Sequence, residues 1–132
     1  MSTTPAAASV CIIACNEERN LPRCLESVAW ADERVVVVDA RSSDATERIA
    51  REMGARVVRR DYEGNVEQKN VALDHAKHDW VIALDADEAL LPELAEAIRA
   101  MLAEGGGRAD GFQVSRVTFH LGEIRGSEAV IE

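Results

Sequence analysis

The amino-acid sequence predicts an open α/β sandwich, in which a mostly parallel sheet carries helices on both faces. The chain has 132 residues, about the size of one domain. Short β-branched runs alternate with segments of helical periodicity, and the four valines of Val35–Val38 lack the polar alternation of a half-exposed strand. Parallel strands joined in series need crossovers long enough for a helix, so strand–helix alternation predicts this fold.

The first strand–helix unit occupies the N-terminal third of the chain. Ser9–Cys15 is a short apolar run, typical of a buried strand. Asn20 is a candidate N-cap and Pro22 suits a first turn, so we expect a helix from there to Ala29. Residues 1–8 are expected to form a short disordered lead.

The second unit contains the least ambiguous strand. Arg34–Asp39 is expected to be covered on both faces, because its valines do not alternate with polar residues. Asp44 and Glu47 have the spacing of a capping box for a second helix, and Gly54 is expected to end that helix.

The remaining elements follow in the same alternation. Ala55–Arg59 is short and flanked by charge, which favours a strand near a sheet edge. Val66–Ala76 is expected to be helical, Asp79–Asp85 to be a fourth buried strand, and Leu91–Ala103 to be a helix with an apolar stripe. Asp110–His120 alternates as a half-exposed strand does, and the rest of the chain is expected to be a loop.

The charge and the length of the apolar runs argue against a nucleic-acid-binding protein and a transmembrane protein. With 24 acidic and 15 basic residues the net charge is −9, which disfavours a nucleic-acid-binding protein. Eleven of the acidic residues and only three basic ones lie within residues 61–104, a distribution typical of a solvated face or of a divalent-cation site. Apolar runs are too short for a transmembrane segment.

The number of cysteines indicates the redox state of the cellular compartment. Cys11, Cys15 and Cys24 are odd in number, so they predict no disulfide framework and favour a reducing compartment. Cys11 and Cys15 are interpreted as small buried apolar residues rather than metal ligands, because no histidine lies near them in sequence. Without a secretory signal at the N-terminus, we expect a cytoplasmic protein.

Carboxylates follow three of the expected strands. In open α/β sheets ligands bind outside the carboxyl ends of the strands, where this chain carries Asn16 and Glu17, then Asp39, then Asp85 and Asp87. A carboxylate at the end of a buried strand is costly to desolvate unless it meets a cation or several donors. If the strand geometry continues, Asp85 and Asp87 point the same way and could share one Mg²⁺ or Mn²⁺.

Less specific interpretations remain open at this edge. Asp87 or Glu88 could simply cap the next helix, since Asp-x-Asp alone is a weak motif. Lys69, one of two lysines, is either a surface lysine or a positive charge for a nucleotide phosphate or base carbonyl. The first strand is followed by no glycine-rich loop, which removes the main support for dinucleotide and P-loop sites.

Four short motifs occur in an order that resembles a known family. They are Asn-Glu-Glu at 16–18, Asp-x-x-Ser-Ser-Asp-x-Thr at 39–46, Gln-Lys-Asn-x-Ala-Leu at 68–73 and Leu-Asp-Ala-Asp-Glu at 84–88. Together they resemble the amino-terminal, nucleotide-binding half of family 2 glycosyltransferases, which have the Rossmann-like GT-A fold of nucleotide-diphospho-sugar transferases. The resemblance runs from about Ser9 to Glu123 and is greatest to the branch of the lipopolysaccharide core glucosyltransferases.

The resemblance implies a role for each candidate residue. Asp39 would contact the nucleoside, and Asn16 and Glu17 would line the nucleotide pocket. Lys69 would lie beside the base or the phosphates. Asp85 would contact the nucleotide sugar and, with Asp87, would bridge Mn²⁺ or Mg²⁺ to the diphosphate.

The implied activity is metal-dependent, inverting transfer of a sugar from a nucleotide-diphosphate sugar, with a UDP-sugar favoured. The acceptor would be a hydroxyl of a glycan or of a lipid-linked molecule, in synthesis of cell-surface polysaccharide or lipopolysaccharide. Such a protein could associate peripherally with a membrane.

The sequence departs from the family pattern at two positions and in length. Ala14 stands where the family often has Thr, and Arg41 where it often has Gly, so a positive φ at Arg41 would cause strain. Only 45 residues follow Asp87, so we expect a truncated domain without the acceptor half that supplies the catalytic base. Should the chain transfer sugar by itself, Glu123 or Glu128 would be the expected base.

Two alternatives compete with the glycosyltransferase. One is a catalytically silent nucleotide-binding or interaction module, whose exposed sheet edge would pair with another chain. Exposure of the Asp110–His120 strand would also favour self-association. The other is a nucleotidyltransferase, which is disfavoured because Asn16-Glu17-Glu18 is not a loop rich in glycine and lysine.

Overall fold

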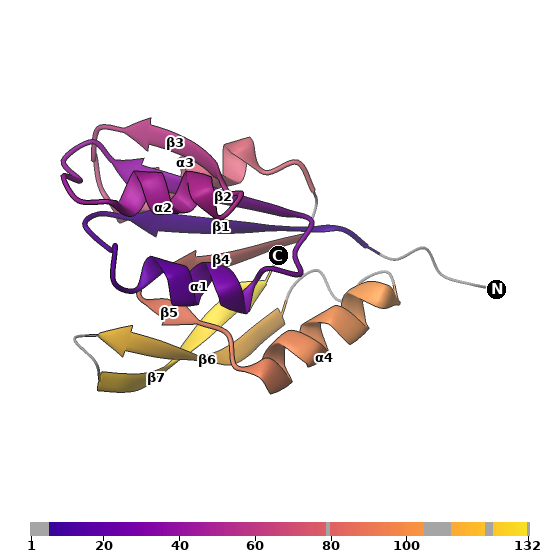
Figure 1. The fold of residues 1–132 in the computed structure, drawn as a ribbon. Helices are drawn as coiled ribbons and strands as arrows, with labels where there is room; N and C mark the ends of the chain where they lie inside the picture. The colour runs from indigo at the N-terminus through magenta and orange to yellow at the C-terminus, as the bar shows by residue number, and fades with distance from the viewer. Residues whose placement is uncertain (1–5, 79, 105–111, 121–122, 132) are drawn as a thin grey trace.

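The computed structural model describes the backbone of residues 6–78, 80–104, 112–120 and 123–131. The burial and contacts of side chains are described for residues up to 104. One seven-stranded sheet has the strand order β3-β2-β1-β4-β7-β6-β5 (Figure 1). The elements are β1 (Ala8–Ala14), α1 (Leu21–Ser27), β2 (Glu33–Asp39), α2 (Thr46–Glu52), β3 (Arg56–Arg60), α3 (Asn65–His75), β4 (Trp80–Asp85), β5 (Glu88–Ala89), α4 (Pro92–Ala103), β6 (Phe112–His120) and β7 (Glu123–Ile131).

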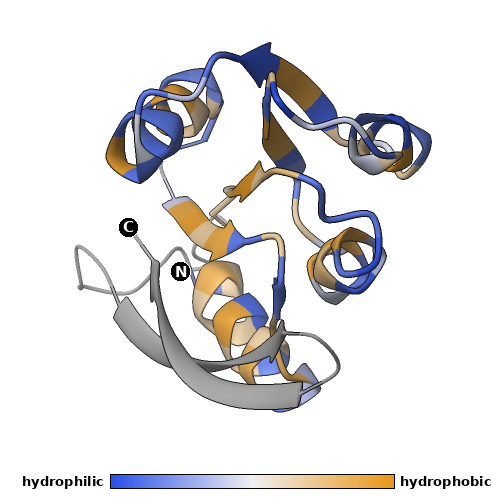
Figure 2. Cartoon of the chain, turned by 90° about the vertical axis from the view of Figure 1, so that its left-hand side faces the viewer, coloured by the Kyte–Doolittle hydropathy of each residue, from blue (hydrophilic) through white to orange (hydrophobic). Residues whose placement is uncertain are grey.

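The first four strands are parallel and confirm the open α/β sandwich. β1 lies between β2 and β4, and β3 pairs with the outer side of β2 at the sheet edge, as its charged flanks predict. Each of α1, α2 and α3 connects two of these strands. Figure 2 views the sheet from the end at the left of Figure 1 and shows helices on both sides of it.

The other half of the sheet is antiparallel. β7 pairs with β4, β6 with β7, and β5 with β6. The prediction was wrong for two of these strands. Residues 123–131 were expected to be a loop but form β7, and β5 was not expected at all. β7 contains Gly126 and three charged residues, which have a low propensity for strands. The sequence of this segment therefore does not predict the strand, which forms through pairing with other strands. The predicted half-exposure of Asp110–His120 concerns side chains outside the described residues.

Alternation along the strands separates two apolar layers. Val10 and Ile12 on β1 belong to the layer beneath α1, α2 and α4, whereas Cys11 belongs to the layer beneath α3. In the valine run, Val36 packs in the first layer and Val37 in the second, and both are fully buried. The uninterrupted valines therefore mark two-sided burial, as the sequence predicts.

One of the two predictions for the ends of α2 is confirmed and the other is wrong. Gly54 (φ 85°) ends α2, as expected, because this left-handed backbone suits glycine. The predicted capping box is wrong, because Ala45 is the N-cap residue and Asp44 binds neighbouring groups of its own loop and the loop after β1. Among the described residues, no helix combines the length and the apolar character needed to cross a membrane.

Truncation of a buried leucine tests the layered core. Leu25 on α1 is fully buried in the larger layer, so Leu25→Ala should lower the free energy of unfolding by about 3 kcal/mol. Leu73 on α3 is 38% exposed, so Leu73→Ala should cost less than about 1 kcal/mol. Urea denaturation of both variants measures the difference, and equal losses would contradict the assigned packing.

Candidate functional site

A pocket of about 200 Å³ opens where β1, β2 and β4 end. It unites three of the predicted site residues, Glu17, Asp39 and Asp85. Neither Asn16, Lys69 nor Asp87 is among the described residues that line it. Its lining comprises Ile13, Ala14, Cys15, Glu17, Asp39, Tyr62, Asn65, Gln68, Asp85 and Ala86.

Hydrogen bonds attach the loop after β1 to the loop after β2 on one side of the pocket. The backbone N–H groups of Asn16, Glu17 and Glu18 donate to side-chain oxygens of the other loop. In return, Glu18 Oε2 accepts from the backbone N–H of Ala45 (3.2 Å). The acceptors of the three donors are, in order, Ser42 Oγ (3.0 Å), Thr46 Oγ1 (2.8 Å) and Asp44 Oδ2 (3.1 Å).

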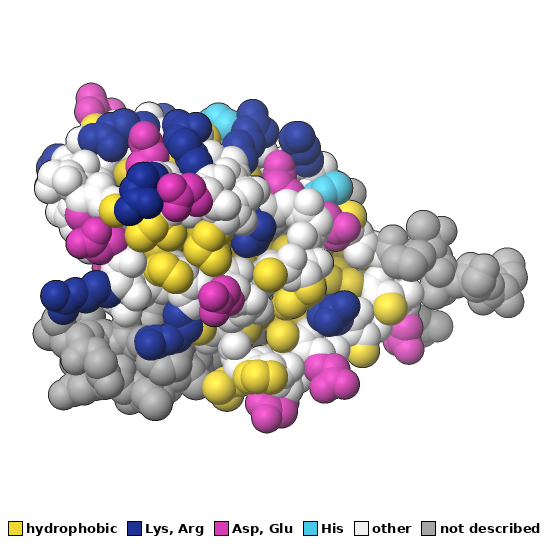
Figure 3. All heavy atoms as spheres, in the orientation of Figure 1, with side chains coloured by type: hydrophobic (Ala, Val, Ile, Leu, Met, Phe, Trp, Pro, Cys, Tyr) yellow, Lys and Arg dark blue, Asp and Glu magenta, His cyan; other side chains and the backbone are white. Residues whose placement is uncertain are grey.

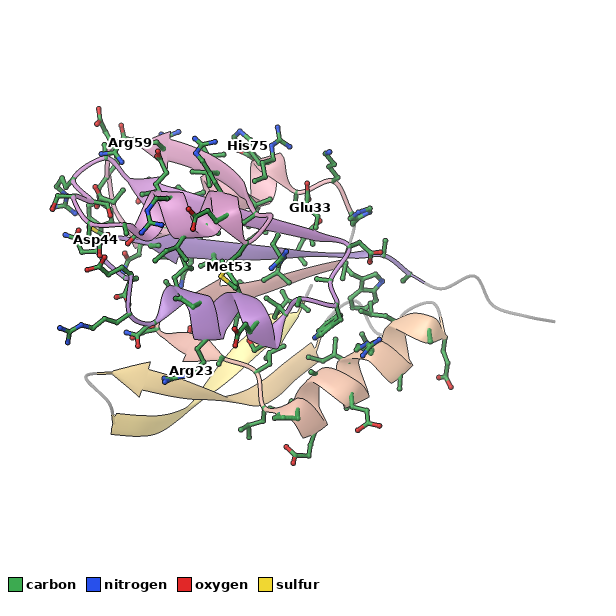
Figure 4. The ribbon with its side chains drawn as sticks, in the orientation of Figure 1. Arg23, Glu33, Asp44, Met53, Arg59 and His75 are labelled. Carbon is green, nitrogen blue, oxygen red and sulfur yellow. The ribbon has the colours of Figure 1, made fainter. Side chains whose placement is uncertain are left out.

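Two residues brace the loop after β2 further. Asp44 accepts hydrogen bonds from both the backbone N–H and the hydroxyl of Thr46, whose side chain is fully buried. Arg59 on β3 donates to the carbonyl of Ala40 (2.6 Å) and to that of Ser42 (3.2 Å). Figure 4 shows Asp44 near the end of β2, opposite the end where Glu33 begins that strand. The Ser-Ser-Asp-x-Thr motif therefore holds two loops together rather than capping a helix.

Asn16 is part of this attachment. With φ 53° it is the only non-glycine residue of positive φ in the described part of the chain, a conformation that asparagine tolerates better than most residues. Its side-chain Oδ1 accepts from the backbone N–H of Ser43 (2.8 Å). The strain considered for Arg41 is absent, because Arg41 is not among the described residues of positive φ.

Asp39 lies at the end of β2 with 2% of its surface exposed. Arg41 donates to both of its oxygens, through its backbone N–H (2.8 Å), Nε (3.1 Å) and Nη2 (2.6 Å). The Arg41 guanidinium also lies over the ring of Tyr62, 4.7 Å from the centroid. One exposed side chain thus covers a buried carboxylate and stacks on an aromatic ring beside the pocket.

The contact between Arg41 and Asp39 determines the electrostatics at this end of the pocket. The hydrogen bonds from Arg41 hold the pKa of Asp39 below its ordinary value, although burial opposes them. Burial and the neighbouring Asp39 raise the pKa of the Cys15 thiol. Cys11 is buried as predicted, whereas Cys15 was also expected to be buried but is half-buried and lines the pocket. Cys24 is buried too, and all three are free thiols.

A cluster of three carboxylates lies after β4. Asp85, Asp87 and Glu88 each place one oxygen within 4.8 Å of the others. Glu88, which is buried, accepts a hydrogen bond from the backbone N–H of Asp85 (2.7 Å), and α4 begins only at Pro92. Capping of a helix therefore does not account for this cluster. Two half-exposed carboxylates beside a buried one fit a hard divalent cation that keeps open positions for other oxygen ligands.

The helix α3 presents a different residue to the pocket from the one predicted. Lys69 is exposed, whereas Gln68 lines the pocket and is only 2% exposed. Tyr62 and Asn65 extend the same wall and are hydrogen-bonded to each other (2.9 Å). Sequence reasoning missed all three as site residues. A weak signal for Gln68 was its place three residues before Val71, because residues with that spacing share one side of a helix.

Comparison with known proteins identifies the class. A family model described as "Glycosyl transferase family 2" matches residues 9–125, and the chain belongs to this family. A protein of Rickettsia bellii named an uncharacterized glycosyltransferase is 36% identical over 118 residues, which are 89% of this chain and 40% of that protein. The chain thus spans well under half the length of that relative.

Two further proteins are similar over most of the chain. The lipopolysaccharide core biosynthesis glycosyltransferase LpsC of Rhizobium meliloti is 31% identical over 119 residues, 86% of this chain and 43% of that protein. A crystal structure of glucosyl-3-phosphoglycerate synthase from Mycobacterium tuberculosis, in complex with Mn²⁺, UDP and phosphoglyceric acid, superposes with a TM-score of 0.54 at 27% identity. That superposition covers 64% of this chain and 34% of the other, and confirms the GT-A fold.

Substitution of Asn16 separates its two contributions to the loop. Asn16→Ala removes the bond to Ser43 and puts a Cβ at positive φ, so it should lower the free energy of unfolding by about 1–2 kcal/mol. Asn16→Gly loses the same bond without that steric cost, so its loss should be smaller. Thermal denaturation compares them, and an equal or larger loss for glycine would contradict the backbone argument.

Removal of Arg41 tests the control of the Asp39 carboxyl. Arg41→Gln deletes the guanidinium, so the pKa of Asp39 should rise toward or above its ordinary value of 3.8. A lowered pKa in the folded state stabilises above the unfolded value and is lost as pH falls through the folded one. The stability difference between wild type and variant should therefore be largest above about pH 4. Carbon-detected NMR titration of Asp39 measures the shift, with exposed Arg48→Gln as control.

Proposed function

We propose that this chain binds the donor of an inverting glycosyltransferase, a nucleotide-diphosphate sugar, with a UDP-sugar favoured. The observation that carries the proposal is the pocket itself, where Asp39 and Tyr62 lie at one end and Asp85 at the other. β2 and β4 flank β1, so the two ends are separated by two strand spacings, about 10 Å. A nucleoside diphosphate can span that distance, with its base near Asp39 and its diphosphate near Asp85.

The metal is assigned to the Asp85 end of the pocket. Asp85 and Asp87 would hold Mn²⁺ or Mg²⁺, while Glu88 is oriented by the backbone N–H of Asp85. When bound, such an ion offsets negative charge on a departing diphosphate. The Mn²⁺ and UDP named in the M. tuberculosis structure support both the ion and the nucleotide.

Roles for the other predicted residues follow their positions. Glu17 lines the pocket and would contact the donor, whereas Asn16 would act indirectly, by holding the loop that carries Glu17. Lys69 is exposed on α3 and would reach the nucleotide only from the rim. Glu123 and Glu128 lie on β7, and a role for either as catalytic base stays a prediction.

The wider setting is part of the proposal. We propose a cytoplasmic enzyme of cell-envelope or lipopolysaccharide synthesis, acting on a glycan or lipid-linked acceptor, and the similarity to LpsC supports this. Peripheral association with a membrane is proposed on the exposed arginines of β3, Arg56, Arg59 and Arg60. β3 lies at the top of Figure 1, and in the same orientation Figure 3 shows several Lys and Arg side chains along the upper edge. Self-association stays a prediction.

Calorimetric titration tests the donor site. UDP should bind in the presence of Mn²⁺, and Asp87→Asn should weaken that binding about tenfold or more, because a carboxylate ligand of the cation is lost. Without metal the variant should bind UDP as wild type does. The control is Asp74→Asn, an exposed carboxylate on α3 outside the pocket.

Three results would change the assignment. No binding of UDP at millimolar concentration with Mn²⁺ would refute the donor site. Equal losses with and without metal would assign Asp87 to folding. Binding without transfer to any acceptor hydroxyl would favour the catalytically silent nucleotide-binding module.

A further inference from the structure

The side chain of Arg41 occupies the carboxylate of Asp39 at the end of β2. Together with the backbone N–H of the same residue, Nε and Nη2 lie 2.6 to 3.1 Å from the two carboxylate oxygens. An ionised carboxylate offers about four acceptor positions, so these contacts leave little room for another donor. Any hydroxyl or N–H of a ligand that approaches Asp39 in the pocket therefore competes with the guanidinium.

The contact joins a buried group to an exposed one. The side chain of Asp39 is 4% exposed, whereas that of Arg41 is 69% exposed. An exposed arginine returns to water at little cost, because water replaces its hydrogen bonds. The buried carboxylate instead needs another donor when the guanidinium leaves. The Arg41 side chain is therefore the part of this pair that can move.

The loop that carries Arg41 does not depend on the guanidinium. The backbone N–H of Arg41 bonds to Asp39 Oδ1 (2.8 Å), as in an Asx-turn, and that of Ser42 bonds to the carbonyl of Asp39 (2.9 Å). Arg59 donates to the carbonyls of Ala40 and Ser42. Release of the guanidinium therefore leaves the backbone of this loop held in place.

Tyr62 gives the guanidinium a second contact. The guanidinium carbon lies 4.7 Å from the centroid of the ring, and the Tyr62 hydroxyl donates to Asn65 Oδ1 (2.9 Å). Tyr62 and Asp39 both line the pocket, whereas Arg41 is not among the described residues that line it. Movement of this one side chain therefore frees a carboxylate and an aromatic ring that belong to the pocket.

We infer that Arg41 is a latch, a side chain that competes with the nucleotide-sugar donor for Asp39 and is displaced when the donor binds. This inference rests on the proposed function and deepens it, because it concerns how access to the same pocket is controlled. A site that is open for only part of the time binds its ligand more weakly, in proportion to the open fraction. Arg41 therefore lowers the affinity of the chain for its donor.

Calorimetric titration of the 132-residue chain with UDP and Mn²⁺ tests the latch. Arg41→Ala removes the guanidinium but keeps the backbone N–H that bonds to Asp39, so it should bind UDP about fivefold or more tightly than wild type. Its affinity for pyrophosphate with Mn²⁺ should not rise, because pyrophosphate has no nucleoside to reach Asp39. The matched control is Arg48→Ala, which removes an exposed arginine paired with Glu52 and should leave UDP binding unchanged.

Thermal denaturation separates a latch from a residue needed only for folding. Without nucleotide, Arg41→Ala should unfold at a lower temperature than wild type, because the buried Asp39 loses charged donors. Loss of a residue needed only for folding would not tighten UDP binding, whereas loss of a latch lowers stability and raises affinity.

NMR reports the position of the latch directly. Tyr62 is the only tyrosine in the sequence, so selective labelling of tyrosine gives one set of ring signals. In the free wild type, nuclear Overhauser contacts should connect this ring to the side chain of Arg41. These contacts should disappear when UDP and Mn²⁺ are added.

The latch would be overturned by any of three results. Equal or weaker UDP binding by Arg41→Ala would show that the guanidinium does not compete with the donor. A gain shared by pyrophosphate or by Arg48→Ala would reflect the overall charge instead. Ring contacts that persist with bound UDP would show that the guanidinium stays in place. Failure of the proposed function is a different result, in which neither the wild type nor Arg41→Ala binds UDP.

Discussion

The pocket depends on the attachment of the loop after β1 to the loop after β2. Three consecutive N–H groups, those of Asn16, Glu17 and Glu18, point at side chains of the other loop and would otherwise be unpaired at the end of a strand. Once they are bonded, Glu17 and Asp39 have fixed positions beside each other. The apolar layers on either face fix the strands, but these polar contacts fix the loops that line the pocket.

The sequence predicts this fold well where the signal is periodic. Uninterrupted valines, strand–helix alternation and a Gly after α2 each reflect a local rule, and the strands that carry the site were placed within one or two residues. The attachment of the loops was not predicted, because its bonds join residues 26 to 29 positions apart and leave no periodic trace. β7 was missed for the same reason, since its strand character comes from pairing with β6.

Strand position was a better guide than helix position to which residues line the pocket. Asp39 and Asp85 lie at strand ends, where any ligand of an open sheet must approach, and the structure brings them to one pocket. On α3 the prediction chose Lys69 for its charge. Successive residues of a helix differ by about 100° in direction, so the adjacent Gln68 faces the pocket while Lys69 faces solvent. Charge was therefore a poor guide to which residue of α3 lines the pocket, and a role for Lys69 in binding stays a prediction.

The attached loops also bear on how this domain can change in length. Connections at the carboxyl edge of a sheet are usually where insertions and deletions are accommodated. Here residues 16–18 are joined to residues 42–46 by five hydrogen bonds. An added residue in either loop would therefore displace the donors and acceptors of these bonds. The connection from β3 to α3, residues 61–64, carries no such bonds to those two loops among the described residues. Variation in the shape of the pocket can therefore enter at residues 61–64 without breaking the bonds between those two loops, although a change at Tyr62 would remove the ring over which Arg41 lies.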